Sequence, residues 1–381
     1  MASELSRYHP ETRAAQALGA HDPVTSGVLP PVQLSTTYLR APDNSYPFGR
    51  VYGRGDNPTP ESAEALLASL ESGKEGLIFS SGMSAAVAVF FSLKPGDHVL
   101  APQAMYWALR LWLQTTATEW GLHVTFVGME DLSAVRLAAQ PGRTKLIWVE
   151  TPSNPTWSIT DIAALAEIAR TVGARLVVDN TVPTPVHTRP LELGAHIVMH
   201  SATKYLNGHS DVIAGALVAA ECDDFWLRIK AFRKSGGAVL GPLDSFLLVR
   251  GMRTLFLRIA RSSQTAQFLA EKLQGHAMLD RVLYPGLTSH SGHHIAQKQM
   301  QGGFSGMLSI VVAGGAPKAI EVAAKVKLWV RATSLGGPES LIEHRASVEG
   351  GNSSIAPGLL RLSVGLEQAN DLLDDLTAAL T

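Results

Sequence analysis

The chain has 381 residues, of which 46% are hydrophobic and 17% charged, so it can bury the cores of two domains and is too apolar to be disordered. Its 32 lysines and arginines nearly balance its 33 aspartates and glutamates, which excludes the strong net field that draws a protein to nucleic acid or an acidic membrane. The single cysteine, Cys222, excludes an internal disulfide framework and a thiolate metal site, and it is typical of a reducing compartment.

The sequence contains no segment that suggests export or membrane insertion. The first residues lack a basic region followed by an apolar core, so we expect no secretory signal. The longest apolar stretch, residues 77–93, is interrupted by Ser80-Ser81-Gly82 and is shorter than the roughly 20 residues that cross a bilayer. We therefore expect a cytoplasmic protein whose partners are small molecules and other copies of itself, with no nucleic-acid or membrane partner.

Residues 1–57 are predicted to form an extended arm rather than a domain. Prolines recur throughout this stretch and interrupt every candidate helix except a short one at residues 12–18. The arm has too little apolar periodicity to pack on its own.

The next segment predicts a helix and then a strand–turn–helix unit. Apolar residues recur at helical spacing over residues 60–71, and Gly73 ends that helix. In the following sequence, GLIFSSGMSAAVAVFFSL, Gly82 and Met83 begin the second helix, where free N–H groups favour a phosphate. A glycine at such a joint is equally often a simple steric accommodation. The chain has no Walker A or GxGxxG pattern, which argues against an NTPase or a dinucleotide enzyme.

Strands and helices alternate as far as residue 220. Strands are expected at residues 98–102, 123–127, 144–150 and 175–179, with helices between them, which predicts a mainly parallel sheet covered on both faces. Tyr106 lies near the start of one of these helices, in a region where neighbouring tryptophans make core packing an equally simple role. Asn154 follows a strand, in a turn forced by two prolines.

A long helical region, punctuated by Gly236-Gly237 and Pro242, leads to a smaller domain that begins near Gly251. Strands are expected at residues 282–286, 305–314, 329–337 and 359–365, with helices at 316–326 and 368–380, so this domain is expected to be α+β. The predicted organisation is an arm (1–57), a large α/β domain (58–250) and a C-terminal domain (251–381).

One lysine and one aspartate suggest the chemistry. Asp179 ends the apolar strand RLVVD, and Lys204 follows the next apolar segment, so both can face one crevice at the edge of the sheet. Pyridoxal phosphate needs a lysine amine for covalent attachment and an anion beside its ring nitrogen. Most lysines are solvated surface charges, and the pairing with Asp179 is what favours the functional interpretation.

Seven motifs carry a family resemblance over nearly the whole chain. They are YGRGDNPT (52–59), FSSGMSA (79–85), ETPSNPT (150–156), VVDNT (177–181), HSATKYLNGHSD (200–211), SLGGPESLIEH (334–344) and LLRLSVGLE (359–367). Together they closely resemble the Cys/Met-metabolism family of pyridoxal-phosphate (PLP) enzymes, which includes cystathionine γ-synthase, cystathionine β- and γ-lyases and methionine γ-lyase. The resemblance implies the α/β architecture of PLP-dependent transferases of fold type I.

The resemblance also implies roles for individual residues. Lys204 is implied to hold the cofactor and to transfer protons, Asp179 to contact its ring nitrogen, Tyr106 to stack on the ring and Asn154 to contact the phenolic oxygen. The residues implied to bind the cofactor phosphate are Gly82, Met83, Ser201 and Thr203, together with Tyr52 and Arg54 donated by the arm of a neighbouring subunit. Arg361 is implied to bind the substrate α-carboxylate, with Ser334 and Tyr52 beside it. The family implies a dimer at least, and two such dimers in a tetramer.

Three departures from the family pattern leave the substrate open. Thr333 stands where cystathionine γ-synthases and γ-lyases typically carry a glutamate, Ala108 replaces the cysteine of methionine γ-lyases, and the loop 344–358 is shorter than in the γ-lyases. The leading prediction is elimination or replacement of the γ-substituent of an amino acid derived from homoserine or homocysteine. The alternatives are a cystathionine β-lyase, a γ-lyase with a non-sulfur leaving group such as that of canavanine, and an inactive homologue with a binding role.

The segment SHSGHHIAQ (289–297) suggests a metal site by its three histidines, but no carboxylate or thiolate lies beside them in the sequence. We therefore expect no metal.

Overall fold

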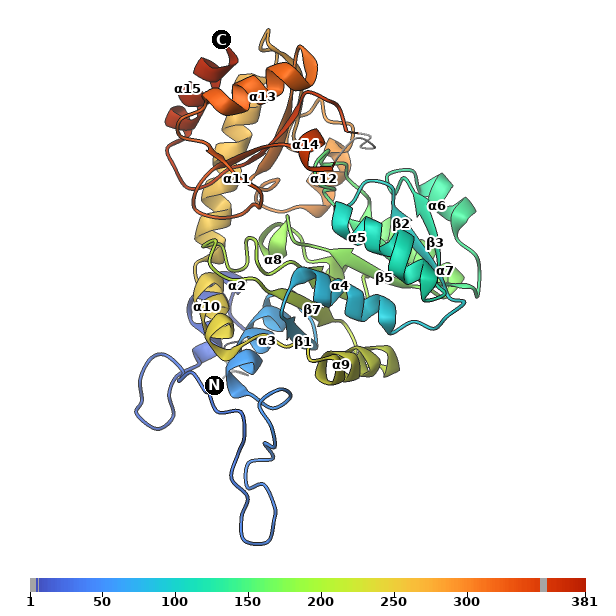
Figure 1. Ribbon diagram of the computed structural model, residues 1–381, viewed down its shortest axis with the longest axis vertical. Coiled ribbons are helices and arrows are strands. Elements are labelled where there is room, and N and C mark those ends of the chain that lie inside the picture. Colours follow the sequence, from blue (N-terminus) through green and yellow to red (C-terminus); the bar gives the residue numbers. More distant parts are fainter. Residues whose placement is uncertain (1–4, 6, 350–354) are drawn as a thin grey trace.

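The computed structural model describes residue 5, residues 7–349 and residues 355–381. Two sheets dominate it, with a long N-terminal segment that extends away from both (Figure 1). The larger sheet contains β1 (Glu75–Phe79), β2 (His98–Pro102), β3 (His123–Val127), β4 (Thr144–Glu150), β5 (Arg175–Asp179), β6 (Ile197–His200) and β7 (Gly215–Ala219). The smaller sheet contains β8 (Leu279–Leu283), β9 (Met307–Val312), β10 (Val330–Arg331), β11 (Leu341–His344) and β12 (Leu359–Ser363).

The larger sheet is mainly parallel, as the sequence predicts. Its strand order is β1-β7-β6-β5-β4-β2-β3, in which β7 runs antiparallel to both of its neighbours and the other pairs are parallel. The carboxyl ends of β4, β5 and β6 therefore meet at one edge of the sheet. In open α/β sheets this edge is where ligands bind.

Helices cover both faces of this sheet, because its strands are apolar on both sides. The covering helices of the larger sheet are α3 (Pro58–Leu70), α4 (Gly82–Phe91), α5 (Trp107–Trp112), α6 (Leu132–Ala138), α7 (Ile162–Val172), α8 (Thr184–His187), α9 (Asp224–Gly236) and α10 (Pro242–Met252). Successive side chains of β4 point to opposite faces of the sheet: Trp148 packs in the core with α4 and α9, whereas Val149 packs in the core with α7.

The smaller sheet has the order β10-β11-β12-β9-β8, and its pairs are antiparallel apart from β10 and β11. The remaining helices are α11 (Leu255–Leu273), α12 (His293–Gln299), α13 (Gly315–Lys325), α14 (Arg345–Glu349) and α15 (Ala369–Leu380). Helix α11 packs with α13 and α15 in one buried core with the strands, and it runs from the large sheet's side to the C-terminal end (Figure 1). The expected α+β arrangement of this part is confirmed.

Some boundaries differ from the sequence predictions. The stretch predicted as one strand at 329–337 is a strand only over Val330–Arg331, and β11, which the sequence analysis missed, follows it. The short helix of the arm, α2, spans Pro10–Ala15 and not 12–18, because Leu18 has a left-handed φ of 55°. Part of the loop 344–358 lies outside the described residues.

Within the described part of the chain, no helix is both long and apolar enough to cross a membrane. The arm itself contains little regular structure, and several of its apolar side chains are fully open to solvent in the single chain.

Candidate active site

A cavity of about 510 Å³ lies at the carboxyl edge of the larger sheet, against the smaller sheet. Both sheets line it. The larger sheet and its loops contribute Gly82, Met83, Tyr106, Glu150, Asn154, Asp179, Ser201, Thr203 and Lys204; the part of the chain around the smaller sheet contributes Thr333, Ser334, Arg345 and Arg361. The structure thus brings together every site residue predicted from the sequence except Tyr52 and Arg54.

Lys204 follows β6 and reaches across the cavity. Its Nζ donates a hydrogen bond to Ser334 Oγ at 2.7 Å. Burial and, to a smaller extent, the Arg361 guanidinium lower the pKa of Lys204 to about 8, against the opposing effect of Glu343. A lysine with this pKa can exchange a proton near neutrality, which an exposed lysine cannot do efficiently.

Asp179 is the last residue of β5, and its carboxylate is held by the turn that follows. Its Oδ1 accepts hydrogen bonds from the backbone N–H of Thr181 at 3.0 Å and from its hydroxyl at 2.5 Å. The same hydroxyl accepts the N–H of Ser201 at 2.8 Å, so it ties the end of β5 to the segment that carries Lys204. Burial raises the pKa of Asp179, against the effect of the Thr181 hydrogen bonds and of the His200 charge.

The start of α4 forms a close approach to the Ser201 segment. A Cβ placed on Gly82 would lie 2.9 Å from both Cβ and Oγ of Ser201, so any other residue here would fill the space in front of the helix. Helix α4 has ten residues, and its first N–H groups face this space. The Thr203 hydroxyl exchanges hydrogen bonds with the backbone of Ala214, donating to its carbonyl and accepting from its N–H, at 3.1 and 3.0 Å.

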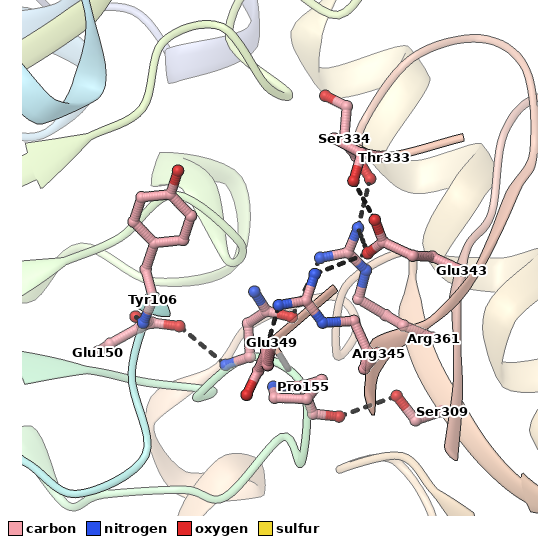
Figure 2. A network of polar contacts seen from close by, with 11 residues as sticks. Tyr106, Glu150, Pro155, Ser309, Thr333, Ser334, Glu343, Arg345, Glu349 and Arg361 are labelled. Carbon is pink, nitrogen blue, oxygen red and sulfur yellow. Dashed lines mark hydrogen bonds and ion pairs between the residues drawn. The ribbon is translucent and has the colours of Figure 1, made fainter. Parts of the chain in front are cut away.

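Arg361, in β12, is buried in a network of charges from the smaller sheet (Figure 2). Its Nη2 lies 2.7 Å from Glu343 Oε2 and donates to the carbonyl of Ser334 at 2.8 Å. Arg345 shares the same Glu343 oxygen at 2.7 Å. Thr333, the residue that replaces the family glutamate, donates its hydroxyl hydrogen bond to the other oxygen of Glu343.

The contacts in this network account for the pKa shifts of Glu343 and Arg361. Burial favours the neutral form of Glu343, but Arg361, Thr333 and Arg345 together outweigh it and lower the pKa of that carboxyl. Burial also lowers the pKa of Arg361 to about 10, with Glu343 opposing it. The Glu343 carboxylate is therefore ionised and already engaged by three side chains.

Sequence analysis missed Glu150, Glu343 and Arg345. Glu150 is the last residue of β4, Glu343 lies within β11, and Arg345 begins α14. A signal for all three exists in the sequence, since each is a charged residue at or next to the end of an apolar strand, the position that also identified Asp179.

Tyr52 and Arg54 lie outside the cavity. The Arg54 guanidinium packs over the Tyr52 ring, 5.5 Å from its centroid, and Arg54 lies beside β1 and α9 with Glu75, Leu77 and Lys230. A single chain therefore does not unite them with Lys204.

No group of three or more His, Cys, Asp or Glu side chains that could hold a metal ion occurs in residues 7–349 or 355–381. In the histidine-rich segment 289–297, His293 Nδ1 is 2.8 Å from the carbonyl oxygen of Pro285, and this contact holds the start of α12.

A doubly covered parallel sheet, with a lysine and an aspartate converging at its carboxyl edge, defines the class of PLP-dependent enzymes of fold type I. Comparison with known proteins narrows this class. A family model described as Cys/Met metabolism PLP-dependent enzyme matches residues 11–381. The chain belongs to this family and is a PLP-dependent enzyme.

Several relatives resemble the chain over its whole length. A cystathionine gamma-synthase of Mycobacterium bovis is 44% identical over 380 residues, which cover 97% of this chain and 96% of the relative. A cystathionine beta-lyase of Coxiella burnetii is 41% identical over 388 residues and covers 100% of both chains. The crystal structure of a cystathionine gamma synthase from Xanthomonas oryzae pv. oryzae in complex with cystathionine superimposes with a TM-score of 0.93 at 37% identity, covering 98% of both chains.

The residues of the cavity fit pyridoxal phosphate. Lys204 offers an amine of lowered pKa, Asp179 a half-buried carboxyl, and the space in front of Gly82 offers backbone N–H groups for an anion. A lysine, a carboxylate and a helix N-terminus at one edge of the sheet form the donor set that this cofactor requires.

Proposed function

We propose that the protein catalyses γ-elimination or γ-replacement on an amino acid derived from homoserine or homocysteine. The observation that carries this proposal is the position of Ser334 between two groups. Its hydroxyl accepts the hydrogen bond of Lys204 Nζ at 2.7 Å, and its carbonyl accepts that of Arg361 Nη2 at 2.8 Å. An amino acid whose carboxylate binds Arg361 therefore has its Cα within reach of the Lys204 amine.

Arg361 binds the substrate carboxylate in this proposal. Its planar guanidinium suits two parallel hydrogen bonds to a carboxylate, and its burial excludes competing water. Glu343 and the carbonyl of Ser334 both contact Nη2 of Arg361 and fix the orientation of the guanidinium. The clamp is therefore oriented before the substrate arrives.

Lys204 acts as the proton carrier. When bound, pyridoxal phosphate supplies an electron-accepting ring that stabilises negative charge at the substrate carbons. The Lys204 amine removes the proton from Cα and then a proton from Cβ, and its lowered pKa matches this task near neutrality. Expulsion of a γ-substituent needs a proton to leave Cβ, so a base that reaches both carbons is required.

The remaining cavity residues hold the cofactor. Asp179 would contact the ring nitrogen, Tyr106 would stack on the ring and Asn154 would contact the phenolic oxygen. Backbone and hydroxyl groups from the start of α4 and the segment after β6 bind the phosphate, namely those of Gly82, Met83, Ser201 and Thr203.

The leaving group is the open part of the proposal. Glu343 already forms ion pairs with Arg361 and Arg345 and accepts a hydrogen bond from Thr333, so its carboxylate is not free to bind the distal amino group of cystathionine. This favours a substrate whose γ-substituent carries no cation, such as an O-acylated homoserine. Cystathionine β-lysis is the second candidate, since the Coxiella burnetii relative with that name matches over its full length.

The test is product identification with the purified enzyme. Incubation with O-acylhomoserine alone, O-acylhomoserine plus cysteine, cystathionine and canavanine separates the candidates. Formation of 2-oxobutyrate or cystathionine from O-acylhomoserine supports γ-chemistry. Pyruvate from cystathionine as the dominant product supports the β-lyase, and absence of turnover with every substrate supports the inactive homologue.

The second part of the proposal is a shared active site. In the single chain the arm exposes large apolar side chains, among them Leu39 at 93%, Phe48 at 91% and Val24 at 89%. Several exposed apolar side chains in one segment are typical of a surface that packs on another protein chain. We infer that the arm packs on a neighbouring subunit, where Tyr52 and Arg54 complete that subunit's phosphate site and Tyr52 also borders its substrate. A dimer is then the minimal active unit, and a pair of dimers is expected.

The shared site can be tested by mixing two inactive variants, Arg54→Ala and Lys204→Ala, under conditions that allow subunit exchange. Each mixed dimer contains one site that lacks both groups and one intact site, so activity should return to about a quarter of wild type under random exchange. A mixture that stays inactive despite demonstrated exchange contradicts the shared site.

Two further features complete the proposal. The chain divides into the arm (1–57), a cofactor-binding domain (58–250) and a C-terminal domain (251–381), which limited proteolysis at the boundaries can test. We also expect the enzyme to act in the cytoplasm, as its composition and single cysteine suggest.

A further inference from the structure

Glu150 is a buried carboxyl in the cavity for which the proposed function has no role. It is the last residue of β4, with 8% of its surface exposed, and it lies next to Asp179 in the pairing of β4 with β5. It takes part in no ion pair among the residues that the structure describes. Burial, together with the neighbouring Asp179, raises the pKa of Glu150 to about 8. Keeping a carboxyl here therefore has an energetic cost, which requires an explanation.

Both oxygens of Glu150 accept backbone hydrogen bonds. Oε2 accepts the N–H of Tyr106 at 2.8 Å, and Oε1 accepts the N–H of Asn154 at 2.8 Å (Figure 2). Tyr106 lies 44 residues away in the sequence, at the start of α5. One side chain thus joins the two loops that carry Tyr106 and Asn154, both of which contact the cofactor ring in the proposed function.

The two loops depend on Glu150 to different extents. The turn that contains Asn154 has a second anchor, because the carbonyl of Pro155 accepts a hydrogen bond from Ser309 Oγ at 2.8 Å (Figure 2). The main-chain N–H of Tyr106 is held by Glu150, and the Tyr106 side chain is about half exposed and makes no capping bond to its own helix. The position of the Tyr106 ring is therefore the one more sensitive to Glu150.

We propose that Glu150 is a positioning residue that fixes Tyr106, and secondarily Asn154, against the cofactor by accepting both of their main-chain N–H groups. The proposal rests on the roles assigned above to Tyr106 and Asn154. It requires two acceptor oxygens at the end of β4. Neither an amide nor a shorter carboxylate provides these: an amide has one acceptor, and an aspartate is too short to reach both loops.

The primary test is Glu150→Gln in the holoenzyme. The substitution keeps the shape of the side chain but points an NH₂ group at one of two N–H donors, so one bond is lost and a donor–donor contact is created. We expect the variant to retain the visible absorbance of bound cofactor while its visible circular dichroism falls at least about twofold, because the ring is held less asymmetrically. We expect kcat to fall about 10- to 100-fold through misplacement of the ring, with a smaller change in KM.

The matched control is Glu119→Gln, an exposed glutamate beyond α5, which should leave absorbance, dichroism and kcat at wild-type values. Wild-type dichroism and kcat in Glu150→Gln overturn the proposal. Because the dichroism is measured without substrate, this outcome is independent of which amino acid the enzyme consumes.

A double-variant cycle separates positioning from a merely structural role. In a Tyr106→Leu background, a residue that acts through Tyr106 has less left to disturb, so Glu150→Gln should lower kcat by clearly less than it does alone. Multiplicative effects overturn the proposal. If Glu150→Gln yields too little folded protein, Glu150→Asp serves in the same measurements: a reduced dichroism supports the proposal, and a wild-type signal contradicts it.

Discussion

On the two sides of the cavity, the pKa values of carboxyl groups are shifted in opposite directions. On the side of the larger sheet, the half-buried Asp179 and the buried Glu150 end adjacent strands, and desolvation raises the pKa of both carboxyls. On the side of the smaller sheet, Glu343 is as buried as Glu150, but two arginines and a threonine hydroxyl lower its pKa. The same residue type at the same depth thus titrates in opposite directions, because only one side contains guanidinium groups.

This difference separates the functions of the two sides. A carboxyl without an ion pair gains most from a cationic group that enters the cavity, as the protonated ring nitrogen of the cofactor does. A network whose carboxylate is already paired with two guanidinium groups instead orients Arg361, which can still bind a substrate carboxylate. In the proposed function, the larger sheet's side therefore carries the chemistry and the smaller sheet's side binds the substrate carboxylate.

The largest expected effect is on the larger sheet's side. Lys204→Ala removes both the attachment point and the proton carrier, so we expect turnover to fall by about 10⁴-fold or more. The visible absorbance of attached cofactor should disappear. Steady-state kinetics and an absorbance spectrum check this, and an active variant with a wild-type spectrum would remove the basis for the proposed function.

The substitution Asp179→Asn tests the role of the negative charge on this carboxyl. The substitution keeps the shape and removes the charge, so the cofactor should stay bound while kcat falls about 10²- to 10³-fold, the usual effect of losing one preorganised electrostatic contact. Cofactor content is measured after dialysis, and kcat at saturating substrate. Retention of near wild-type kcat would show that Asp179 does not face the ring nitrogen.

Arg361→Lys tests the recognition side. Lysine keeps the charge but loses the planar fork, so KM for the amino acid should rise about 10- to 100-fold with a smaller loss of kcat. Its absorbance spectrum should match wild type, because the substitution lies on the opposite side from the cofactor. A drop in kcat at unchanged KM would instead place Arg361 in the chemical step.

The smallest expected effect is the influence of Arg361, on one side of the cavity, on the pKa of Lys204, on the other side. The pKa of Lys204 is lowered to about 8, so in cofactor-free protein its amine is protonated and unreactive below pH 8 and becomes free as the pH rises. Labelling of Lys204 by an amine reagent, followed by mass spectrometry with other lysine peptides as references, should have its midpoint near pH 8. In Arg361→Gln the loss of a nearby cation should move this midpoint upwards, and an unchanged or lower midpoint contradicts the coupling.

The sequence predicted much of the site because its residues follow local rules. Asp179 ends an apolar strand, Lys204 follows the next one, and Gly82 begins a helix after a third, so a parallel sheet brings them to one edge without further information. The alternation of strands and helices was sufficient for the fold class, which the structure confirms.

What the sequence by itself determined is therefore the family, the cofactor, the mainly parallel sheet and the residues that strand ends deliver to its edge. Only the tertiary structure decided the partners of those residues. Glu150 accepts a hydrogen bond from Tyr106, 44 residues away in the sequence, and Glu343 meets Arg361 across the pairing of β11 with β12, where β11 itself was missed. The reason is physical: periodicity and turn residues encode local conformation, whereas the ionisation and orientation of a buried carboxyl depend on which distant donors fold against it.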